Sequence, residues 1–204
     1  MQDQKGQCQI EGGDAKEPFL GKDAKESIDF EISLAPLDST DMGIIRMWRN
    51  DYKIWKWCRQ NDLISDYEQK VWFEKQAKDP TIKMYKLILS FLNEKKEQQM
   101  IHFGVCGFTS IDLINRHAEF SLYVAPAYQG LKLSECALRC LLEHGFKNLG
   151  FHVIWGEVFE DNPAMRVFEK VGFKYDGTRR DFYFRDGKFI SSELISIVED
   201  EWKQ

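Results

Sequence analysis

The spacing of hydrophobic and polar residues changes near the middle of the chain. From Glu119 to Val124 every second residue is apolar, which is the pattern of a strand with one buried face. From Leu133 to His144 the apolar residues recur every three or four positions, which is the pattern of an amphipathic helix. The link between them contains Gly130, and a helix that starts just after a glycine offers free N–H groups to an anion. We therefore expect this link to bind a ligand.

The same reasoning predicts the other elements. Two helices are expected in the first half of the chain, one after a capping residue among residues 38–40 and one after Ser65, which has Glu68 three positions later as in a capping box. Asp186 followed by Gly187 is a strong hairpin signal. Apolar runs predict strands at residues 30–34, 86–92, 102–111, 151–159, 173–184 and 188–198. Strands around helices define an α/β domain with a mixed sheet.

The length of 204 residues fits one domain with a core of ordinary size. Residues 1–29 are rich in glycine and charged side chains and have few apolar ones, so burial could not offset the entropy of ordering them. We expect residues 1–29 to be a disordered tail. Residues 30–204 are expected to form a single domain.

Charge and apolar content limit the classes of partner. The net charge is -5, with acids and bases interspersed, so the sequence has no basic face for nucleic acid. No apolar run approaches the ~20 residues of a membrane span, and the polar N-terminus lacks the hydrophobic segment of a signal peptide. We expect no nucleic acid, no membrane and a cytoplasmic location.

The five cysteines and four histidines show no metal-ligand spacing. We expect free thiols and no metal. Cys136 and Cys140 lie four residues apart on the apolar face of the predicted helix, so they are interpreted as core residues and not as thiol nucleophiles.

One motif resembles a known family. Residues 119–134 resemble the acyl-CoA motif of the GNAT superfamily of N-acetyltransferases, in which a strand leads through a Gln/Arg-x-x-Gly-x-Gly/Ala loop into a helix. The residues are Glu-Phe-Ser-Leu-Tyr-Val-Ala-Pro-Ala-Tyr-Gln-Gly-Leu-Lys-Leu-Ser. Lys132 stands where the second-position glycine is usual, and Ser134 stands where Gly or Ala is usual. The resemblance implies that main-chain groups of the loop hold the pyrophosphate of acetyl-CoA, at Gln129, Gly130, Leu131, Lys132, Leu133 and Ser134.

A second motif follows at residues 157–173. It resembles the family signature Asn-x-x-(three or four residues)-Tyr-Glu-Lys-x-Gly-Phe, with Asn162 in place and Phe168 at the usual Tyr position. The resemblance implies that Asn162 lies near the pantetheine arm of acetyl-CoA. Asn162 also precedes Pro163, so it is equally interpreted as a helix N-cap, and both roles remain open. Phe168 has no hydroxyl to protonate a leaving thiolate, so water or a tyrosine would have to do so.

The resemblance covers residues 30–198 and implies a GNAT-like fold: a mixed, mostly antiparallel sheet with a central splay, flanked by helices. The strand at Glu119 and the strand at Phe151 would separate and leave a wedge for the pantetheine arm. Main-chain groups of Leu122, Tyr123 and Val124 would line this wedge, and one of their N–H groups would meet the oxyanion.

Acetyl transfer to an amine needs the amine in its unprotonated form. A carboxylate near the wedge could relay the proton that the amine loses. Glu119 is the first candidate, because it starts the central strand. In the branch of the family that includes ribosomal-protein N-terminal acetyltransferases, this position often carries Glu. Glu157 on the neighbouring strand is the second candidate. For each residue the alternative is a structural, salt-bridged carboxylate.

Residues 51–86 form an aromatic-rich region. The Trp-Arg-Asn opening just before it, the Ile64-Ser65 step and the Trp72-Phe73 pair resemble the branch with ribosomal-protein N-terminal and nucleotide-amino-sugar acetyltransferases. In that branch this region forms much of the acceptor pocket. The alternative is that its aromatic rings pack against the sheet.

The sequence therefore indicates an N-acetyltransferase that transfers the acetyl group of acetyl-CoA to a primary amine by direct attack in a ternary complex. The amine would belong to a small molecule such as an amino sugar, or to a protein N-terminus. The alternatives are a non-catalytic acyl-CoA-binding relative and a protein-interaction module. The acceptor, the acyl length and the oligomeric state stay open, with a homodimer among the arrangements.

Overall fold

The computed structural model describes residues 5–8, 30–60, 62–93 and 95–202. Its centre is one sheet with the strand order β1-β2-β3-β4-β5-β6-β8-β7. Neighbouring strands are antiparallel except β5 and β6, which are parallel, so the expected mixed, mostly antiparallel sheet is confirmed. The strands are β1 (Lys5–Cys8), β2 (Phe30–Pro36), β3 (Lys83–Leu92), β4 (Gln98–Asp112), β5 (His117–Val124), β6 (Val153–Phe159), β7 (Lys174–Arg185) and β8 (Lys188–Val198).

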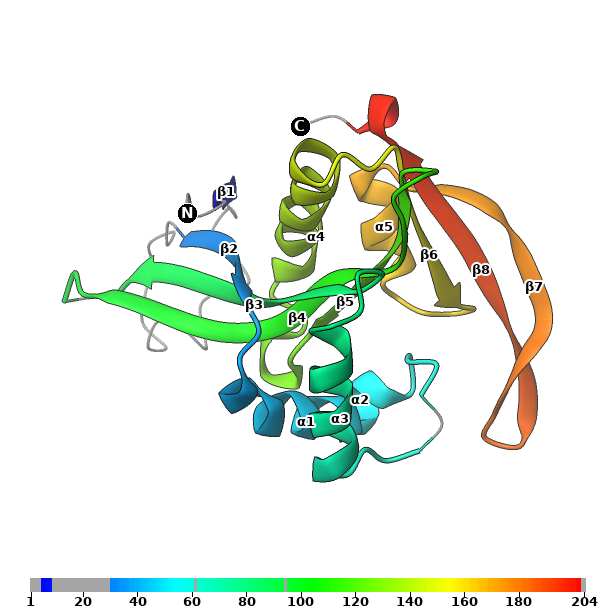
Figure 1. Cartoon of the computed structure of the whole chain (residues 1–204), viewed down its shortest axis with the longest axis horizontal. Helices are drawn as coiled ribbons and strands as arrows, with labels where there is room; N and C mark the ends of the chain where they lie inside the picture. The colour runs from blue at the N-terminus through cyan, green and yellow to red at the C-terminus, as the bar shows by residue number, and fades with distance from the viewer. Residues whose placement is uncertain (1–4, 9–29, 61, 94, 203–204) are drawn as a thin grey trace.

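Helices cover both faces of the sheet (Figure 1). The face above the sheet in that view carries α4 (Leu133–Glu143) and α5 (Met165–Val171). The face below it carries α1 (Met42–Asn50), α2 (Tyr52–Trp55) and α3 (Asp66–Gln76). Short 3-10 turns occupy Ser39–Asp41, Pro126–Tyr128 and Glu199–Glu201, and a π-helical turn at His144–Asn148 continues α4.

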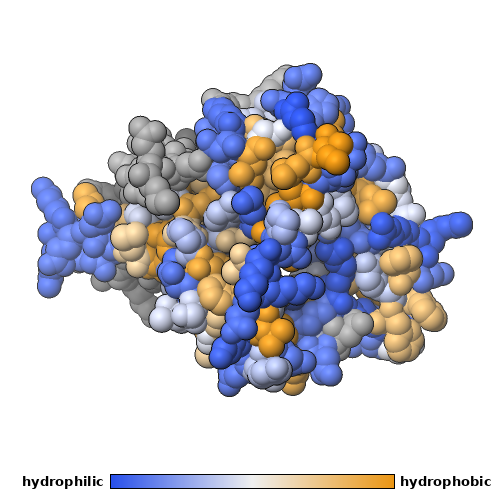
Figure 2. Space-filling model, in the orientation of Figure 1, coloured by the Kyte–Doolittle hydropathy of each residue, from blue (hydrophilic) through white to orange (hydrophobic). Residues whose placement is uncertain are grey.

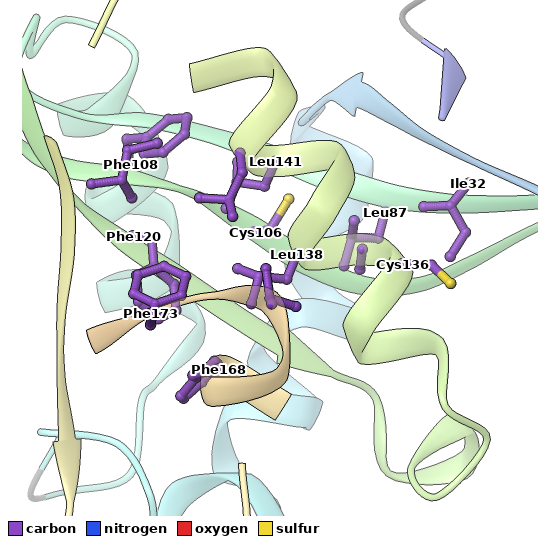
Figure 3. Packing of buried hydrophobic residues seen from close by; sticks show 14 of the residues in the cluster. Ile32, Leu87, Cys106, Phe108, Phe120, Cys136, Leu138, Leu141, Phe168 and Phe173 are labelled. Atoms are coloured by element: carbon purple, nitrogen blue, oxygen red, sulfur yellow. The ribbon is translucent and has the colours of Figure 1, made fainter. Parts of the chain in front are cut away.

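The strands have two buried faces because alternate residues point to opposite sides. On β4, Cys106 belongs to the large core under α4, whereas Val105 packs with Leu37 and Ile45 on the opposite face. Figure 3 shows Leu138 and Leu141 of α4 pointing toward the sheet. α4 and α1 are therefore fixed on opposite sides of the same strands.

Local signals explain where elements begin and turn. Ser65 Oγ accepts the Glu68 N–H at 3.2 Å and Glu68 Oε2 accepts the Ser65 N–H at 2.8 Å, so the expected capping box starts α3. Asp186 and Gly187 have φ of 48° and 78°, as the tight turn between β7 and β8 requires.

The structure adds elements that the pattern did not predict. β1 pairs antiparallel with β2, from Lys5 opposite Ser33 to Cys8 opposite Phe30. The expected tail at residues 1–29 therefore contains a strand, and the rest of that segment lies outside the described residues. α2 also was not predicted, because it is a single turn of four residues with no room for a periodic pattern.

The cysteine expectation needs a correction. Cys58, Cys106 and Cys140 are free, but Cys136 is disulfide-bonded, so the expectation of free thiols is wrong for Cys136. Spacing along the chain does not show which side chains the fold brings together, so this disulfide could not be predicted from the spacing of the cysteines. Among the described residues, no helix is long and apolar enough to cross a membrane.

Candidate active site

The two parallel strands β5 and β6 pair over only a short stretch. The pairing starts with His117 opposite Val153 and ends with Glu119 opposite Trp155. Both strands continue for several residues beyond this last pair. The expected splay in the centre of the sheet is therefore present, and Glu119 stands where it begins.

The point of divergence is filled by an aromatic ring. A Cβ placed on Gly156 of β6 would come within 2.9 Å of Cδ1 of Phe120 and closer still to its Cε1. The ring of Phe120 also packs edge-on against Phe168 and tilted against Phe173, with centroids 5.2 Å and 4.9 Å apart. The missing side chain of Gly156 thus leaves room for Phe120 between the strands.

A cavity of about 270 Å³ lies along this divergence. β5 and β6 supply two of its walls, and the segment after α2 supplies a third. The lining consists of residues 57–60, 119–123 and 157–159 with Arg49, Thr109, Asn162 and Phe168. Of the expected wedge residues, Leu122 and Tyr123 line the cavity, whereas the Val124 side chain is buried in the core.

Glu119 lines this cavity, with its side chain 5% exposed. Its Oε1 accepts a short hydrogen bond from Nη2 of Arg59 within an ion pair. Its Oε2 lies 3.2 Å from Thr109 Oγ1 and 3.4 Å from Ser110 Oγ. The β4–β5 register shifts after Thr109, and Ser110 has φ 50°, which lets two consecutive hydroxyls reach one carboxylate.

Glu157 faces the same cavity and is more enclosed, with its side chain 1% exposed. Its oxygens accept hydrogen bonds from Ser192 Oγ at 2.6 Å, Tyr183 OH at 3.0 Å and Arg179 Nη1 at 3.2 Å. These partners on β7 and β8 match the structural alternative for Glu157. Arg59 Nη1 lies 3.5 Å from its Oε2.

Arg59 is a charged residue of the cavity that sequence reasoning missed. It lies in the irregular segment between α2 and α3, 60 residues before Glu119. Burial is the largest single influence and lowers the pKa of its guanidinium. The charge and hydrogen bond of Glu119, together with Tyr183 and the Glu157 charge, outweigh burial, so the pKa of Arg59 is above its ordinary value. The aromatic-rich region was expected to shape the acceptor pocket, but no local pattern singled out this arginine.

The loop between β5 and α4 contains two residues with a left-handed backbone. Gly130 has φ 83°, and nothing lies within 4 Å of where its Cβ would be, so the loop is open on that side. Lys132 has φ 59° and ψ 8°, so a lysine adopts the left-handed conformation at the position where the family has glycine. Gln129 Nε2 donates to Val124 O at 3.2 Å and ties the loop to the end of β5.

The remaining loop residues contribute through the main chain. Leu133 is buried in the core as the first residue of α4, and Leu131 packs partly buried against the same core. Ser134 follows in the first turn of α4. The free N–H groups of such a first turn attract anions.

Asn162 and Phe168 lie on the α5 side of the cavity. Asn162 Oδ1 accepts the Ala164 N–H at 3.0 Å, so the side chain caps the turn into α5 while the residue lines the cavity. Both interpretations of Asn162 are compatible with this geometry. Phe168 is buried against Phe120, so an apolar ring stands where the family has tyrosine.

Tyrosine hydroxyls near the cavity differ in their surroundings. Tyr183 OH donates to Glu157, and burial followed by that hydrogen bond raises the pKa of Tyr183. Burial also raises the pKa of Tyr123, whose ring lies 5.9 Å from the Arg49 guanidinium. Tyr175 is 62% exposed and does not line the cavity. Tyr123 and Tyr183 therefore remain near the site as protonated hydroxyls.

A second cavity of about 410 Å³ adjoins the first, because both are lined by Arg49, Gln60 and Tyr123. Its other walls combine carboxylates with apolar side chains. They are Asp62 and Glu68 together with Ile45, Leu63, Ile64, Gln69, Trp72, Met84 and Val105. Among the described residues, no group of three or more His, Cys, Asp or Glu is placed to hold a metal ion.

The family model described as the acetyltransferase (GNAT) domain matches residues 31–174, more than half of the chain. The chain therefore belongs to the GNAT acetyltransferase family. It is an N-acetyltransferase, and acetyl transfer from acetyl-CoA to an amine is the reaction of this class.

The sequence identity between this chain and individual relatives is low. The chain is 23% identical to the spermidine N(1)-acetyltransferase of Vibrio cholerae over 173 residues, covering 84% of this chain and 95% of the relative. It is 30% identical to a ribosomal-protein alanine N-acetyltransferase of Haemophilus influenzae, over 46% of this chain and 62% of that protein.

A solved structure agrees with the fold. The spermidine N-acetyltransferase from Vibrio cholerae in complex with CoA and spermine superposes with a TM-score of 0.72 at 22% identity. The superposition covers 83% of this chain and 96% of that one. At this identity the likeness concerns the fold.

Proposed function

We propose that the protein acetylates a primary ammonium group of a linear aliphatic polyamine, by direct attack of the amine on acetyl-CoA in a ternary complex. The observation that carries this proposal is the splay after Glu119, which opens a cavity lined by a buried carboxylate. A channel between parallel strands fits the pantetheine arm. The turn at Gly130 and Lys132 fits the pyrophosphate.

The second cavity supports the proposed acceptor class. Its walls combine two carboxylates with apolar side chains, a chemistry that suits ammonium groups separated by methylene segments. The relatives that span 84% of this chain are spermidine acetyltransferases, whereas the ribosomal-protein enzyme spans 46% of it. Both points favour a polyamine over a protein N-terminus or an amino sugar.

In the proposed mechanism Glu119 accepts a proton from the acceptor, and Glu157 holds the surrounding side chains in place. A main-chain N–H on β5 near Leu122 would stabilise the oxyanion, since β5 has no strand partner on the β6 side there. Tyr183 or water would protonate the leaving thiolate. Holding amine and thioester together can supply ~7 to 11 kcal/mol of the barrier reduction.

The test is release of CoA thiol with a panel of amines. We expect turnover with spermidine and spermine, and slower or no turnover with an alanine-initiated peptide and with an amino sugar. Turnover with the peptide or the amino sugar alone would replace the acceptor assignment. Acetyl-CoA binding without turnover on any amine would favour a non-catalytic acyl-CoA-binding relative.

We also propose that the protein self-associates through the β7–β8 hairpin. β7 is the last strand of the sheet, and Figure 2 shows apolar side chains on the lower right, where this hairpin lies in Figure 1. Phe182, Phe184 and Phe189 on it are 58%, 60% and 63% exposed. A spermidine N-acetyltransferase from Vibrio cholerae with the same fold has a dodecameric structure. A second copy of the chain is therefore the proposed occupant of this surface.

A further inference from the structure

One guanidinium spans two buried carboxylates that line the cavity. Arg59 Nη2 pairs with Glu119, and its Nη1 lies 3.5 Å from Glu157. The carboxylates are 5% and 1% exposed, whereas the Arg59 side chain is 48% exposed. The two anions are fixed in the protein interior, and the cation between them has a path to solvent.

The two carboxylates depend on Arg59 to different degrees. Glu157 keeps Arg179, Tyr183 and Ser192 as partners if Arg59 leaves. Among the described residues, Arg59 alone makes an ion pair with Glu119, whose other partners are neutral hydroxyls. A buried carboxylate without a cation is costly, so Glu119 needs a positive charge beside it whenever it is ionised.

The main chain around Arg59 is anchored independently of its side chain. Arg185 Nη2 donates to Cys58 O at 2.8 Å and to Gln60 O at 3.2 Å. Arg49 Nη2 donates to the Gln60 side chain at 2.9 Å. The Arg59 head group can therefore leave the carboxylates by side-chain rotation while the backbone of this segment stays in place.

The acceptor proposed above is itself a cation. A primary aliphatic amine has a pKa near that of lysine, ~10.4, so it reaches the cavity as an ammonium ion. Ammonium and guanidinium both satisfy a carboxylate, but they cannot occupy the same oxygen of Glu119 at once. Exchange of one cation for the other would keep the buried charge balanced throughout.

We propose that Arg59 is a placeholder cation: it occupies the ammonium subsite at Glu119 until the acceptor displaces it, and it returns when the product is formed. This inference rests on the proposed function. It makes Arg59 a specificity-determining residue, because a neutral acceptor that displaced it would leave Glu119 without a counter-charge.

Acetylation removes the positive charge of the acceptor nitrogen, which allows Arg59 to return to Glu119. The amine nitrogen forms a bond to the thioester carbonyl carbon and the C–S bond breaks. An ammonium ion and acetyl-CoA thus give a neutral amide, CoA thiol and one proton released to solvent. The amide nitrogen carries no charge and cannot balance Glu119, so the return of Arg59 favours release of the acetylated product.

The first experiment measures binding of methylguanidinium to the CoA-bound protein by calorimetry, which requires no turnover. Arg59→Gln vacates the subsite, so methylguanidinium should bind about tenfold more tightly than to the wild type, if Arg59 occupies the subsite nine-tenths of the time. The matched control is Arg49→Gln, which removes another arginine of the cavity that pairs with Gln60 and not with a carboxylate. It should produce no such tightening.

Arg59→Gln leaves Glu119 uncompensated and could fail to fold, so a double variant with Glu119→Gln is included. It removes both charges, and methylguanidinium should then bind no more tightly than to the wild type. Equal affinity of the wild type and the Arg59→Gln variant would overturn the proposal, as would tight binding to the double variant.

The second experiment measures turnover with the best amine from the panel. In the Arg59→Gln variant the KM for the amine should fall several-fold, acetylated product should inhibit more strongly, and methylguanidinium should compete with the amine. If methylguanidinium instead restored lost turnover, Arg59 would be a group that assists the reaction and the placeholder role would be rejected. If no amine were acetylated, the proposed function would fail while the calorimetric result still decided the exchange.

Discussion

Phe120 and Gly156 face each other across the point where β5 and β6 diverge, and the ring of one occupies the space that a side chain on the other would fill. The β5–β6 pairing ends one position before both residues, at Glu119 opposite Trp155. The opening of the cavity thus depends on one large and one absent side chain.

Gly156→Ala should disturb this point. The added methyl group collides with a buried ring that also packs on Phe168 and Phe173, and overpacking of this kind costs ~1 to 3 kcal/mol. We expect a lower melting temperature and weaker acetyl-CoA binding. Adding Phe120→Leu should restore part of the stability. A single variant with native stability and affinity would show that the ring does not shape the cavity.

Glu119→Gln separates base catalysis from a structural role. The substitution keeps the shape but removes the proton-accepting charge, so turnover should fall by ~10²-fold or more while acetyl-CoA affinity is retained. The loss should shrink at high pH, where the amine deprotonates in solution. An effect of the same size at every pH, together with a lower melting temperature, would assign Glu119 a structural role.

Gly130→Val tests the phosphate turn. A β-branched side chain there would obstruct the approach of the pyrophosphate to the loop N–H groups, so we expect at least ~10-fold weaker acetyl-CoA binding by calorimetry. Gly150→Val is the matched control, because Gly150 also has a positive φ, 69°, and open space around its Cβ position, but lies after α4 and its π-helical continuation, away from the loop. It should show similar backbone strain with unchanged affinity, and equal losses in both variants would reject the loop assignment.

His144 should make stability depend on pH. Burial, and to a lesser degree the charge of Lys83, lowers the pKa of His144 below the ordinary histidine value of 6.5. The unfolded chain therefore binds the proton more readily, so the contribution of this group is complete above pH 6.5 and is lost as pH falls through the folded-state pKa. Denaturant unfolding between pH 5 and pH 8 should show this decline, and His144→Gln, which can still bond Tyr85 OH, should flatten it. An unchanged slope in the variant would assign the decline to other groups.

The hairpin prediction concerns assembly. Replacing Phe182, Phe184 and Phe189 by Ser removes exposed rings without touching the cavity, so we expect a smaller particle by light scattering at an unchanged melting temperature of the protomer. A wild-type protein that is monomeric at all concentrations tested would reject self-association through this surface.

The sequence determined much of the fold because its signals are local. The alternation at β5, the helical spacing after Leu133 and the capping box at Ser65 depend only on neighbouring residues. The signal for the expected phosphate-binding loop at residues 129–134 is also local, because a strand, a glycine and a helix start follow one another directly. The sequence also shows that Lys132 stands where the family usually has glycine. Only the structure shows that this lysine adopts the left-handed backbone conformation.

The tertiary structure alone decided how distant segments meet. Arg59 reaches Glu119 across 60 residues of chain, and Arg179 reaches Glu157 from another strand. No periodic pattern encodes such pairs, because each is set by where whole strands and loops pack. Glu119 and Glu157 could be chosen from the sequence as candidate carboxylates, but their partners differ. Burial and charge pairing arise only in the folded chain. They leave Glu119 dependent on the side chain of Arg59, whereas Glu157 is held by several partners on β7 and β8.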